Sequence, residues 1–460
     1  MKFRVLFTAI LLGFYCISCT QQSTPEKPNV VIFFLDDAGF ADFNPFTDSN
    51  NVIAETPHVN KLASEGVTYT NFHVPQAICS ASRAALLTGS YPGRTKVFGA
   101  HPPKAKGLDT IYPTMAEIFK QNGYTTGIFG KWHLGDQEGT RSHDRGFDYS
   151  AGLMYSNDMW EHHPENPRYW GKFPLQYWKN GKVTIDKVTG AHQKQLTQWA
   201  TQESVDFIKN QKEEPFLLYV PYSMPHVPLY VSNDFEGISG KGLYYDVISE
   251  IDWSIGQITA TLKENNLDEN TIVIFTSDNG PWAVYGNHAG KTPFRSYKGT
   301  SFEGGTRSAC IIKYPLQLKG NTTSNKLFNS IDLLPTLSAL ANINLEHEID
   351  GKNVWPYLNE SFTNVPHTYY AYSNVANLEA IASGDGKWKL HLEHNYIELD
   401  SIGADGLPGK YIDLKQPLAL YDMENDPLES KNVIESNPEI AETLTDYAKK
   451  HQEKFYNTTP

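Results

Sequence analysis

The sequence predicts an α/β fold in which helices flank a mostly parallel central sheet, followed by a smaller C-terminal α+β subdomain. Short apolar runs alternate with amphipathic stretches along residues 29–360, an order typical of strands joined by helices. The run Asn29–Leu35 (NVVIFFL) is continuous and apolar, as in a strand covered on both faces. After about Asn359 the runs shorten and Gly and Asp turns separate them, which predicts an antiparallel sheet.

The individual elements follow from local signals. Thr56-Pro57 opens a helix that Gly66 ends, because proline suits the first helical position. Further strands are expected at 125–129, 216–220 and 271–276, and further helices at 113–122 and 331–341. A helix before the last of these strands carries apolar residues at helical spacing: Val247, Ile251, Ile255, Ile258 and Leu262. The C-terminal subdomain is expected to hold strands at 368–372, 387–392 and 418–421 and a last helix over 438–450. Residues 154–182 contain no clear strand or helix.

The N-terminus has the pattern of a targeting segment. Lys2 and Arg4 precede an apolar stretch that is too short to cross a bilayer, and Cys16-Ile17-Ser18-Cys19 resembles a bacterial lipoprotein box. We therefore expect a signal peptide over 1–19, lipidation of Cys19, a tether over 20–28, a catalytic domain over 29–360 and a subdomain over 361–460. The protein would be exported to the periplasm or cell surface and reach the membrane only through its lipid. The alternative is an ordinary cleaved signal with a stray cysteine.

The charge and the cysteine content limit the classes of protein to which this chain can belong. The net charge of −13 gives no electrostatic footprint for nucleic acid. A local cationic pocket could still bind an anion, since screening limits the reach of bulk charge to about 10 Å. Four cysteines, two of them in the leader, leave only Cys79 and Cys310 for the fold, so no disulfide framework is expected. Cys310 lies in an apolar run and is expected in the core.

Acidic pairs follow two of the predicted strands directly. Asp36-Asp37 comes after the first strand, and Asp278-Asn279 comes after the strand at 271–276. Three carboxylates and an amide oxygen suit a hard divalent cation, calcium rather than zinc. Either pair alone is most simply a turn or a helix cap. Two pairs at strand ends of one sheet favour a metal site.

Titratable residues follow the other predicted strands. Lys131 and His133 come after the strand at 125–129, His226 follows the strand at 216–220 between two prolines, and Lys298 lies in a glycine-rich turn. A lone histidine or lysine is usually packed or solvated. The recurrence of such residues at strand ends is what indicates an active site, because ligands bind at the carboxyl edge of such sheets.

The run Cys79-Ser80-Ala81-Ser82-Arg83, followed by Leu86-Leu87-Thr88-Gly89, resembles the signature of the type I sulfatases of the alkaline phosphatase-like superfamily. The resemblance extends from Asn29 to about Glu429, with the family's other motifs in order. It implies an alkaline phosphatase-like sandwich and a cysteine oxidised to formylglycine, whose hydrate attacks sulfur before sulfate is eliminated. Ala81 stands where many members of the family have proline, so the sequence leaves open which maturation enzyme converts Cys79.

The resemblance also implies a role for each matching residue. Asp36, Asp37, Asp278 and Asn279 would bind one calcium ion, and Arg83 would pair with the modified Cys79. Lys131 and Lys298 would hold sulfate oxygens. His226 would be the general acid, and His133 would take a proton from the remaining hydroxyl. A formylglycine-generating enzyme would be an obligatory partner.

The substrate is expected to be a sulfated oligosaccharide or polysaccharide, for example a marine polymer such as ulvan or carrageenan. Residues 154–182 are rich in aromatic side chains that either cover a core edge or stack on sugar rings. His288 and Arg295, just before Lys298, are further candidates for substrate binding. Three alternatives stay open: an aryl sulfatase, a phosphoester or phosphonate hydrolase of the same superfamily, and an inactive glycan-binding lipoprotein.

Overall fold

The computed structural model describes residues 27–47, 54–211 and 214–456 of the chain. The predicted signal peptide, Cys19 and most of the tether lie outside these residues. In the part of the chain that the structure describes, no helix is both long and apolar enough to cross a membrane.

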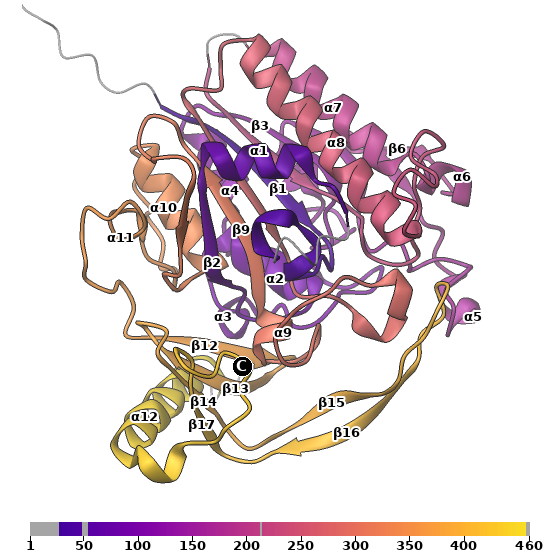
Figure 1. Cartoon of the computed structure of the whole chain (residues 1–460). Helices are drawn as coiled ribbons and strands as arrows, with labels where there is room; N and C mark the ends of the chain where they lie inside the picture. Colours follow the sequence, from indigo (N-terminus) through magenta and orange to yellow (C-terminus); the bar gives the residue numbers. More distant parts are fainter. Residues whose placement is uncertain (1–26, 48–53, 212–213, 457–460) are drawn as a thin grey trace, which may run out of the picture.

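A large mixed sheet forms the centre of the molecule (Figure 1). Its strand order is β10-β2-β9-β8-β1-β7-β3-β4-β5-β6, with β11 paired to β2. The strands are β1 Asn29–Leu35, β2 Val67–His73, β3 Thr125–Lys131, β4 Tyr149–Leu153, β5 Tyr177–Lys179, β6 Lys182–Ile185, β7 Phe216–Pro221, β8 Thr271–Ser277, β9 Arg307–Lys313, β10 Thr322–Ser324 and β11 Phe328–Asn329. The five neighbours β8, β1, β7, β3 and β4 are parallel. The register pairs Val30 with Leu217 on one side and with Ile272 on the other.

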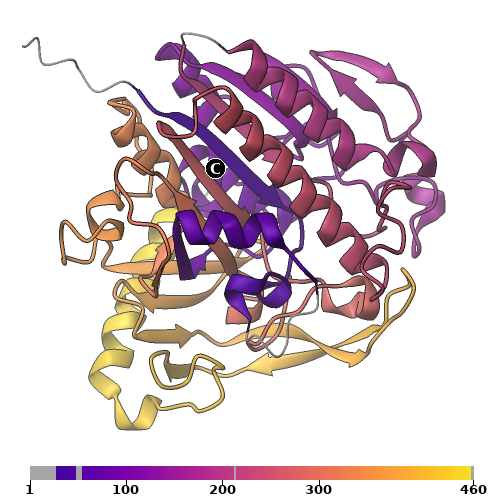
Figure 2. The ribbon, with the colours of Figure 1, turned by 45° about the horizontal axis from the view of Figure 1, so that its top comes forward.

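Helices cover both faces of this sheet, and Figure 2 shows α1 and α8 lying across the same face. The helices up to the end of the sheet are α1 Pro57–Glu65, α2 Cys79–Thr88, α3 Pro92–Thr95, α4 Met115–Gln121, α5 Pro167–Trp170, α6 Gly190–Gln193, α7 Leu196–Asn210, α8 Leu243–Glu264, α9 Glu303–Thr306, α10 Leu333–Leu340 and α11 Trp355–Leu358. The predicted apolar stripe of α8 faces the core, since Ile251 and Ile255 are fully buried. Helix α4 begins at a capping box between Thr114 and Glu117.

The C-terminal region forms a second, smaller unit below the main sheet (Figure 1). A four-stranded antiparallel sheet, β12-β13-β14-β17, packs against the last helix, and β15 and β16 pair separately as a long hairpin. The bounds are β12 Tyr369–Asn374, β13 Asn377–Ser383, β14 Trp388–His391, β15 His394–Ser401, β16 Lys410–Gln416, β17 Ala419–Asp422 and α12 Pro438–Phe455. A second apolar core joins α12 and this sheet to Ala85 of α2.

The predicted fold class is confirmed, and each predicted strand and helix exists with ends shifted by a few residues. The interpretation of residues 154–182 is wrong in part, because they contain α5 and β5. Strand β5 extends the main sheet by pairing with β4, so its Tyr177 belongs to the core. Tyr155 and Trp160 are buried there as well, whereas Tyr169 of α5 is exposed. Cys310 lies fully buried in β9, as expected.

Candidate active site

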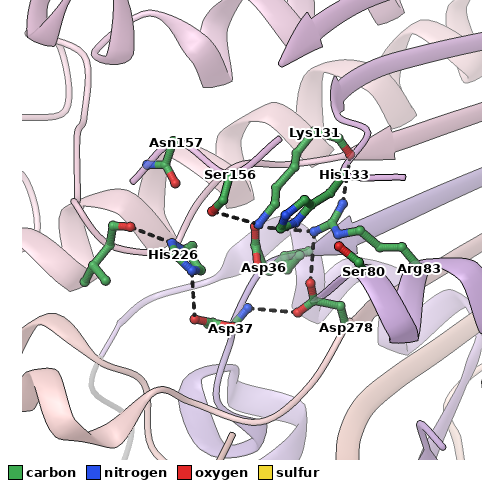
Figure 3. A network of polar contacts seen from close by, with 12 residues as sticks. Asp36, Asp37, Ser80, Arg83, Lys131, His133, Ser156, Asn157, His226 and Asp278 are labelled. Atoms are coloured by element: carbon green, nitrogen blue, oxygen red, sulfur yellow. Dashed lines mark hydrogen bonds and ion pairs between the residues drawn. The ribbon is translucent and has the colours of Figure 1, made fainter. Parts of the chain in front are cut away.

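The carboxyl ends of the five parallel strands meet at one edge of the sheet. Because the strands are adjacent and parallel, the segments that follow them are brought together from distant parts of the chain. These segments supply Asp278 and Asn279 after β8, Asp36 and Asp37 after β1, His226 after β7, Lys131 and His133 at the end of β3, and Ser156 after β4. Figure 3 shows most of these side chains converging.

Helix α2 places Cys79 at this edge. Cys79 is the first residue of the helix, and Gly89 ends it in a left-handed conformation (φ 62°) that favours glycine. All ten residues of α2 are buried, Cys79 at 2% exposure. The positive end of the helix dipole therefore lies at Cys79, which favours an anion there.

Arg83 lies one turn further along α2 and joins three segments of the site. Its Nη2 lies 3.0 Å from Oδ2 of Asp278 and 3.4 Å from Oδ2 of Asp36. Its Nη1 donates to the carbonyl of Lys131 at 2.9 Å. Residues four apart lie on the same face of a helix, so the spacing of Cys79 and Arg83 puts both side chains at the site.

The carboxylates are held by the backbone and by lysines. Asp37 has a left-handed backbone (φ 63°), and its N–H donates to Oδ1 of Asp278 at 3.1 Å. The Nζ of Lys298 lies 2.7 Å from Oδ2 of Asp37, and Lys131 pairs with Asp36. A left-handed conformation is costly for a residue other than glycine, and such strain is typical of functional sites.

Two buried oxygens of the site have no hydrogen-bond partner among the described residues: Oδ1 of Asp36 and Oδ1 of Asn279. The amide of Asn279 is oriented, since its Nδ2 donates to Oδ1 of Asp37 at 2.7 Å. Buried polar atoms are nearly always paired, so the two oxygens point to a missing cationic partner. With Asp37 and Asp278 they form the all-oxygen donor set that calcium prefers.

A second grouping overlaps this donor set. One ligand atom each from Asp36, Asp37, Cys79 and His226 lies within 4.8 Å of the others. Sulfur and imidazole nitrogen suit softer ions than calcium. The unpartnered oxygens therefore favour the hard-cation set, with Cys79 and His226 beside it rather than in it.

The pKa values of the carboxyl groups differ in direction. Burial raises the pKa of Asp36, but the charges of Lys131 and then Arg83 outweigh it and hold the pKa well below its usual value. Burial, with the charge of Asp36, raises the pKa of Asp278 to about 7. A divalent cation beside both groups would favour the ionised form of each.

Backbone carbonyls fix the tautomers of both histidines. Nε2 of His133 lies 3.0 Å from the carbonyl of His101 and must donate to it, so Nδ1 presents its lone pair and has no partner among the described residues. Burial, then the charge of Lys131, lowers the pKa of His133 well below its usual value. His226 donates from Nδ1 to the Val227 carbonyl, and its Nε2 lies 3.6 Å from Oδ2 of Asp37.

Cys79 opens onto a cavity of about 300 Å³. Burial raises the pKa of its thiol to about 12, so the unmodified side chain is a neutral thiol and a weak nucleophile. The cavity is lined by Ile78, Cys79, Ala100, His133, Ser156, Asp158, Met159, His226, Trp282, Lys298, Gly299, Ile397 and Tyr411.

One wall of this cavity comes from the C-terminal hairpin. Ile397 of β15 and Tyr411 of β16 reach the cavity, and Nε1 of Trp282 donates to the hydroxyl of Tyr411 at 3.0 Å. The Nζ of Lys298 lies 4.2 Å from the centre of the Trp282 ring, which holds the lysine by a cation–π contact. Trp282 could have been suspected from its position just after Asp278-Asn279; Tyr411 and Ile397 carry no such signal.

His288 and Arg295 lie apart from the cavity lining. The guanidinium of Arg295 stacks on the Phe302 ring at 3.9 Å and donates to the Glu429 carbonyl at 2.9 Å. His288 lies beside the hairpin tip at Gly406. Both contact the C-terminal subdomain, and a role in substrate binding stays a prediction for them.

This fold and site define a hydrolase for an anionic ester. A profile of the family described as Sulfatase matches residues 28–343. The N-acetylgalactosamine-6-O-sulfatase of Bacteroides thetaiotaomicron is 31% identical, over 92% of this chain and 92% of the relative. The human N-acetylgalactosamine-6-sulfatase is also 31% identical, over 95% of this chain and 88% of its own. The crystal structure of PsFucS1 sulfatase from Pseudoalteromonas sp. superposes with a TM-score of 0.83 at 25% identity, covering 94% and 92% of the two chains.

The chain therefore belongs to the sulfatase family, and it is an enzyme of the sulfuric ester hydrolase class. The resemblance noted from Cys79 and its neighbours is confirmed.

Proposed function

We propose that this protein is a formylglycine-dependent sulfatase that removes sulfate from a sulfated carbohydrate. The observation that carries the proposal is the position of Cys79, at the positive end of α2 and on a cavity that Lys298 and two histidines also line. The names of the two relatives described above support a sugar sulfate as substrate.

The charge balance of the site fits an anionic substrate. The carboxylates of Asp36, Asp37 and Asp278 offset the cations Arg83, Lys131 and Lys298, as the ion pairs between them indicate. One bound calcium ion would leave an excess of two positive charges. A sulfate ester and an ionised nucleophile would offset them, and such preorganised charge lowers the barrier to attack on an anion.

The modified side chain and the ion would each supply one kind of chemistry. Formylglycine derived from Cys79 supplies, as its hydrate, an attacking oxygen and a second hydroxyl that allows sulfate to leave by elimination. Calcium, held by Asp36, Asp37, Asp278 and Asn279, supplies positive charge beside the sulfuryl oxygens.

The chain's own residues would orient the ester and move the protons. Lys298 and Lys131 would bind sulfate oxygens, and Oγ of Ser156, 3.1 Å from Nζ of Lys131, extends the same row of donors. His133 would take the proton of the second hydroxyl at Nδ1, the atom with the free lone pair. His226, which lines the cavity, would donate a proton to the leaving oxygen from Nε2 in its protonated form. Burial, then the charge of Lys298, lowers the pKa of His226, and the negative charge of a bound sulfate ester would favour the protonated form.

Two carbohydrate classes need to be separated within this proposal. The relatives' names favour 6-sulfated N-acetylgalactosamine units. The sequence interpretation favours marine-type fragments such as ulvan or carrageenan. A panel of defined sulfated oligosaccharides from both classes, with 4-nitrophenyl sulfate and 4-nitrophenyl phosphate, decides between them and the aryl sulfatase and phosphoester alternatives.

The direct test of the mechanism is mass spectrometry of the peptide that contains Cys79. We expect the mass change of thiol to aldehyde in protein produced together with a maturation enzyme. Cys310 is the matched control, because it is equally buried but lies in β9 outside the motif, and it should remain a thiol. Full activity from protein whose Cys79 is unmodified would refute the proposal.

Export and lipid anchoring are part of the same proposal. Cys19 would carry the lipid and tether the enzyme at the periplasmic or outer surface of a bacterial membrane. Membrane fractionation of the wild type and of Cys19→Ser tests this. A wild-type protein found entirely in the soluble fraction would leave only an ordinary cleaved signal.

A further inference from the structure

Asp158 is a carboxylate in the cavity that the proposed chemistry does not use. It follows β4, two residues after Ser156, and both residues line the cavity. Asp158 is the only acidic side chain among the described residues of that lining. It is 8% exposed, so its charge is almost fully removed from bulk water.

The segment that carries Asp158 is held firmly. The N–H of Met159 donates to the carbonyl of Ser156 at 3.1 Å, and the N–H of Trp160 donates to the carbonyl of Asp158 at 2.9 Å. Between them, Nδ2 of Asn157 donates to the carbonyl of Pro228 at 3.2 Å. Figure 3 shows Ser156 and Asn157 beside His226 and Lys131. The position of Asp158 is therefore fixed relative to the atoms that would bind sulfate.

The carboxylate of Asp158 lacks a hydrogen-bond donor. Its Oδ1 is buried without a partner among the described residues. The basic nitrogen recorded next to Oδ2 is Nε2 of His163, at 3.8 Å, which is too long for a hydrogen bond. A buried carboxylate oxygen without a donor is costly, and a ligand that supplies an O–H or N–H removes that cost.

The surroundings limit what that ligand can be. The cavity volume of about 300 Å³ is at the small end for ligand pockets. Lys298 and Ser156 mark its sulfate end, while Met159, Ile397 and Tyr411 give it an apolar wall. A sugar with its sulfate at the lysine presents hydroxyl or amide donors to the rest of the lining. A second sulfate placed near Asp158 would meet a like charge.

We propose that Asp158 is a specificity-determining residue, which accepts a hydrogen bond from a hydroxyl or amide N–H of the sulfated sugar and rejects a second anionic group there. This inference rests on the proposed function, because it assumes that the cavity binds a sugar sulfate. The preferred substrate is then a terminal sugar that carries one sulfate and an unmodified donor near it.

The test compares Asp158→Asn and Asp158→Ala with the wild type on N-acetylgalactosamine 6-sulfate, its 3-deoxy and 4-deoxy analogues, the 4,6-disulfate and 4-nitrophenyl sulfate. We expect loss of one hydroxyl to lower the wild-type kcat/KM by about 10- to 100-fold, the usual effect of a hydrogen bond to a charged group. Asp158→Ala should lose the same factor on the parent sugar and no longer distinguish it from that analogue. Asp158→Asn should lower the ratio of kcat/KM for the monosulfate to kcat/KM for the disulfate by tenfold or more.

4-Nitrophenyl sulfate separates a specificity role from a structural one. It has no hydroxyl near the ester, and its leaving group needs little protonation, so the kcat/KM of both variants should stay within about threefold of the wild type. Asp186→Asn is the matched control, since Asp186 is exposed and lies outside the cavity lining. It should match the wild type on every substrate.

Three results would overturn the inference. Asp158→Ala could keep the wild-type discrimination between hydroxyl and deoxy sugars, or it could lose aryl sulfate and sugar turnover equally. The wild type could also hydrolyse the aryl sulfate while neither binding nor hydrolysing any of these sugars. If the wild type hydrolyses no sulfate ester at all, the proposed function itself fails. In that case, calorimetric measurement of the affinities for the same sugars decides whether Asp158 accepts a hydrogen bond from the hydroxyl.

Discussion

The protein buries two clusters of charge, and they are built differently. The catalytic cluster consists of Asp36, Asp37, Arg83, Lys131, Asp278 and Lys298 at the carboxyl edge of the main sheet. The junction cluster consists of His73, Glu303, Lys389, His391 and Glu429, where the C-terminal sheet meets α9 and β2. Every member of both clusters is at most 8% exposed.

The difference lies in the carboxylate oxygens. In the junction cluster, Lys389 lies 2.8 Å from Oε1 of Glu303 and 3.0 Å from Oε1 of Glu429. Oε2 of Glu429 accepts the N–H of Glu303 at 2.8 Å, and Oε2 of Glu303 accepts from Nη1 of Arg307 at 3.4 Å, with Nε2 of His73 3.5 Å away. Each oxygen has a protein partner. In the catalytic cluster Oδ1 of Asp36 has none among the described residues.

Burial of charge therefore does not identify a functional site in this molecule. The carboxylate oxygens of the junction cluster are all paired within the protein and tie two units together, whereas the catalytic cluster leaves a carboxylate oxygen open to a cation. An unpartnered oxygen alone is not sufficient either, because Oε2 of Glu379 also lacks a hydrogen bond and lies away from the cavity lining. The combination of an incomplete cluster with a cavity marks the site.

The largest expected effect comes from removing the proposed nucleophile, Cys79, which lies beside the catalytic cluster. Cys79→Ala should lower kcat by about 10⁴-fold or more, as loss of a covalent nucleophile does in other hydrolases. The midpoint of thermal unfolding should stay within a few degrees, because Cys79 makes no ion pair that holds the fold. Steady-state kinetics and thermal unfolding of the same preparation measure both. Retained turnover, or a large loss of stability, would remove the contrast between the clusters.

The opposite result is expected at the junction cluster. Lys389→Met should leave Glu303 and Glu429 buried without their shared cation and lower the free energy of unfolding by about 3–5 kcal/mol. Urea denaturation measures the loss, and kcat per folded molecule should change little. Lys387→Met is the matched control, since Lys387 is half exposed and 3.8 Å from Glu424, and it should cost less than about 1 kcal/mol. Equal effects of the two variants would contradict the structural role of Lys389.

Removal of calcium should affect the catalytic cluster and leave the junction cluster unchanged. Chelation should abolish most activity and lower the unfolding midpoint, because an ion at a hundred times its Kd adds about 2.7 kcal/mol to the folded state. Asn279→Ala should weaken this response, since it removes an unpartnered oxygen. Lys389→Met should respond to calcium like the wild type. A midpoint that does not depend on calcium would argue against the oxygen site.

The last expected effect concerns stability alone and is a pH dependence from the junction histidines. Burial lowers the pKa of His73 and of His391 to about 4, from an ordinary value of 6.5, although nearby glutamates oppose the shift. Below pH 6.5 the unfolded chain then binds more protons than the folded one, so stability falls as the pH falls from 6.5 to about 4. Each histidine contributes about 1.4 kcal/mol per pH unit in that range.

The measurement is urea denaturation at pH 7 and pH 5. His391→Gln keeps a donor for Oε1 of Glu429. It should lower the number of protons taken up on unfolding by one, and with it the slope of the unfolding free energy against pH. An unchanged dependence would mean that His391 does not titrate between these values.

The sequence predicted four adjacent strands of the eleven-stranded main sheet, β8, β1, β7 and β3, because these strands are apolar and are followed by charged or titratable residues. Asn29–Leu35 was recognisable from seven residues alone, and the position of Asp36-Asp37 followed from it. The same reasoning predicted that His226 and Lys131 lie at the site, because neighbouring parallel strands end at one edge of the sheet. Local pattern and topology are sufficient there.

The cavity wall could not be predicted in this way. Tyr411 reaches the site only because β15 and β16 form a hairpin that leaves the small sheet, and its strand reads as a polar, exposed segment. Arg295 was grouped with Lys298 because they are three residues apart, but its side chain turns toward Phe302 and the C-terminal subdomain. Both cases depend on tertiary contacts that adjacent sequence does not encode.

The β15–β16 hairpin contributes to the wall of the cavity, while the groups proposed to break the bond lie on the main sheet. The segment that the family profile recognises ends at residue 343, whereas Ile397 and Tyr411 lie well beyond it. Insertions or exchanges in the hairpin could therefore reshape the part of the cavity that touches a sugar while the bond-breaking groups on the main sheet keep their places. Selection can act on what the enzyme accepts without disturbing how it cuts.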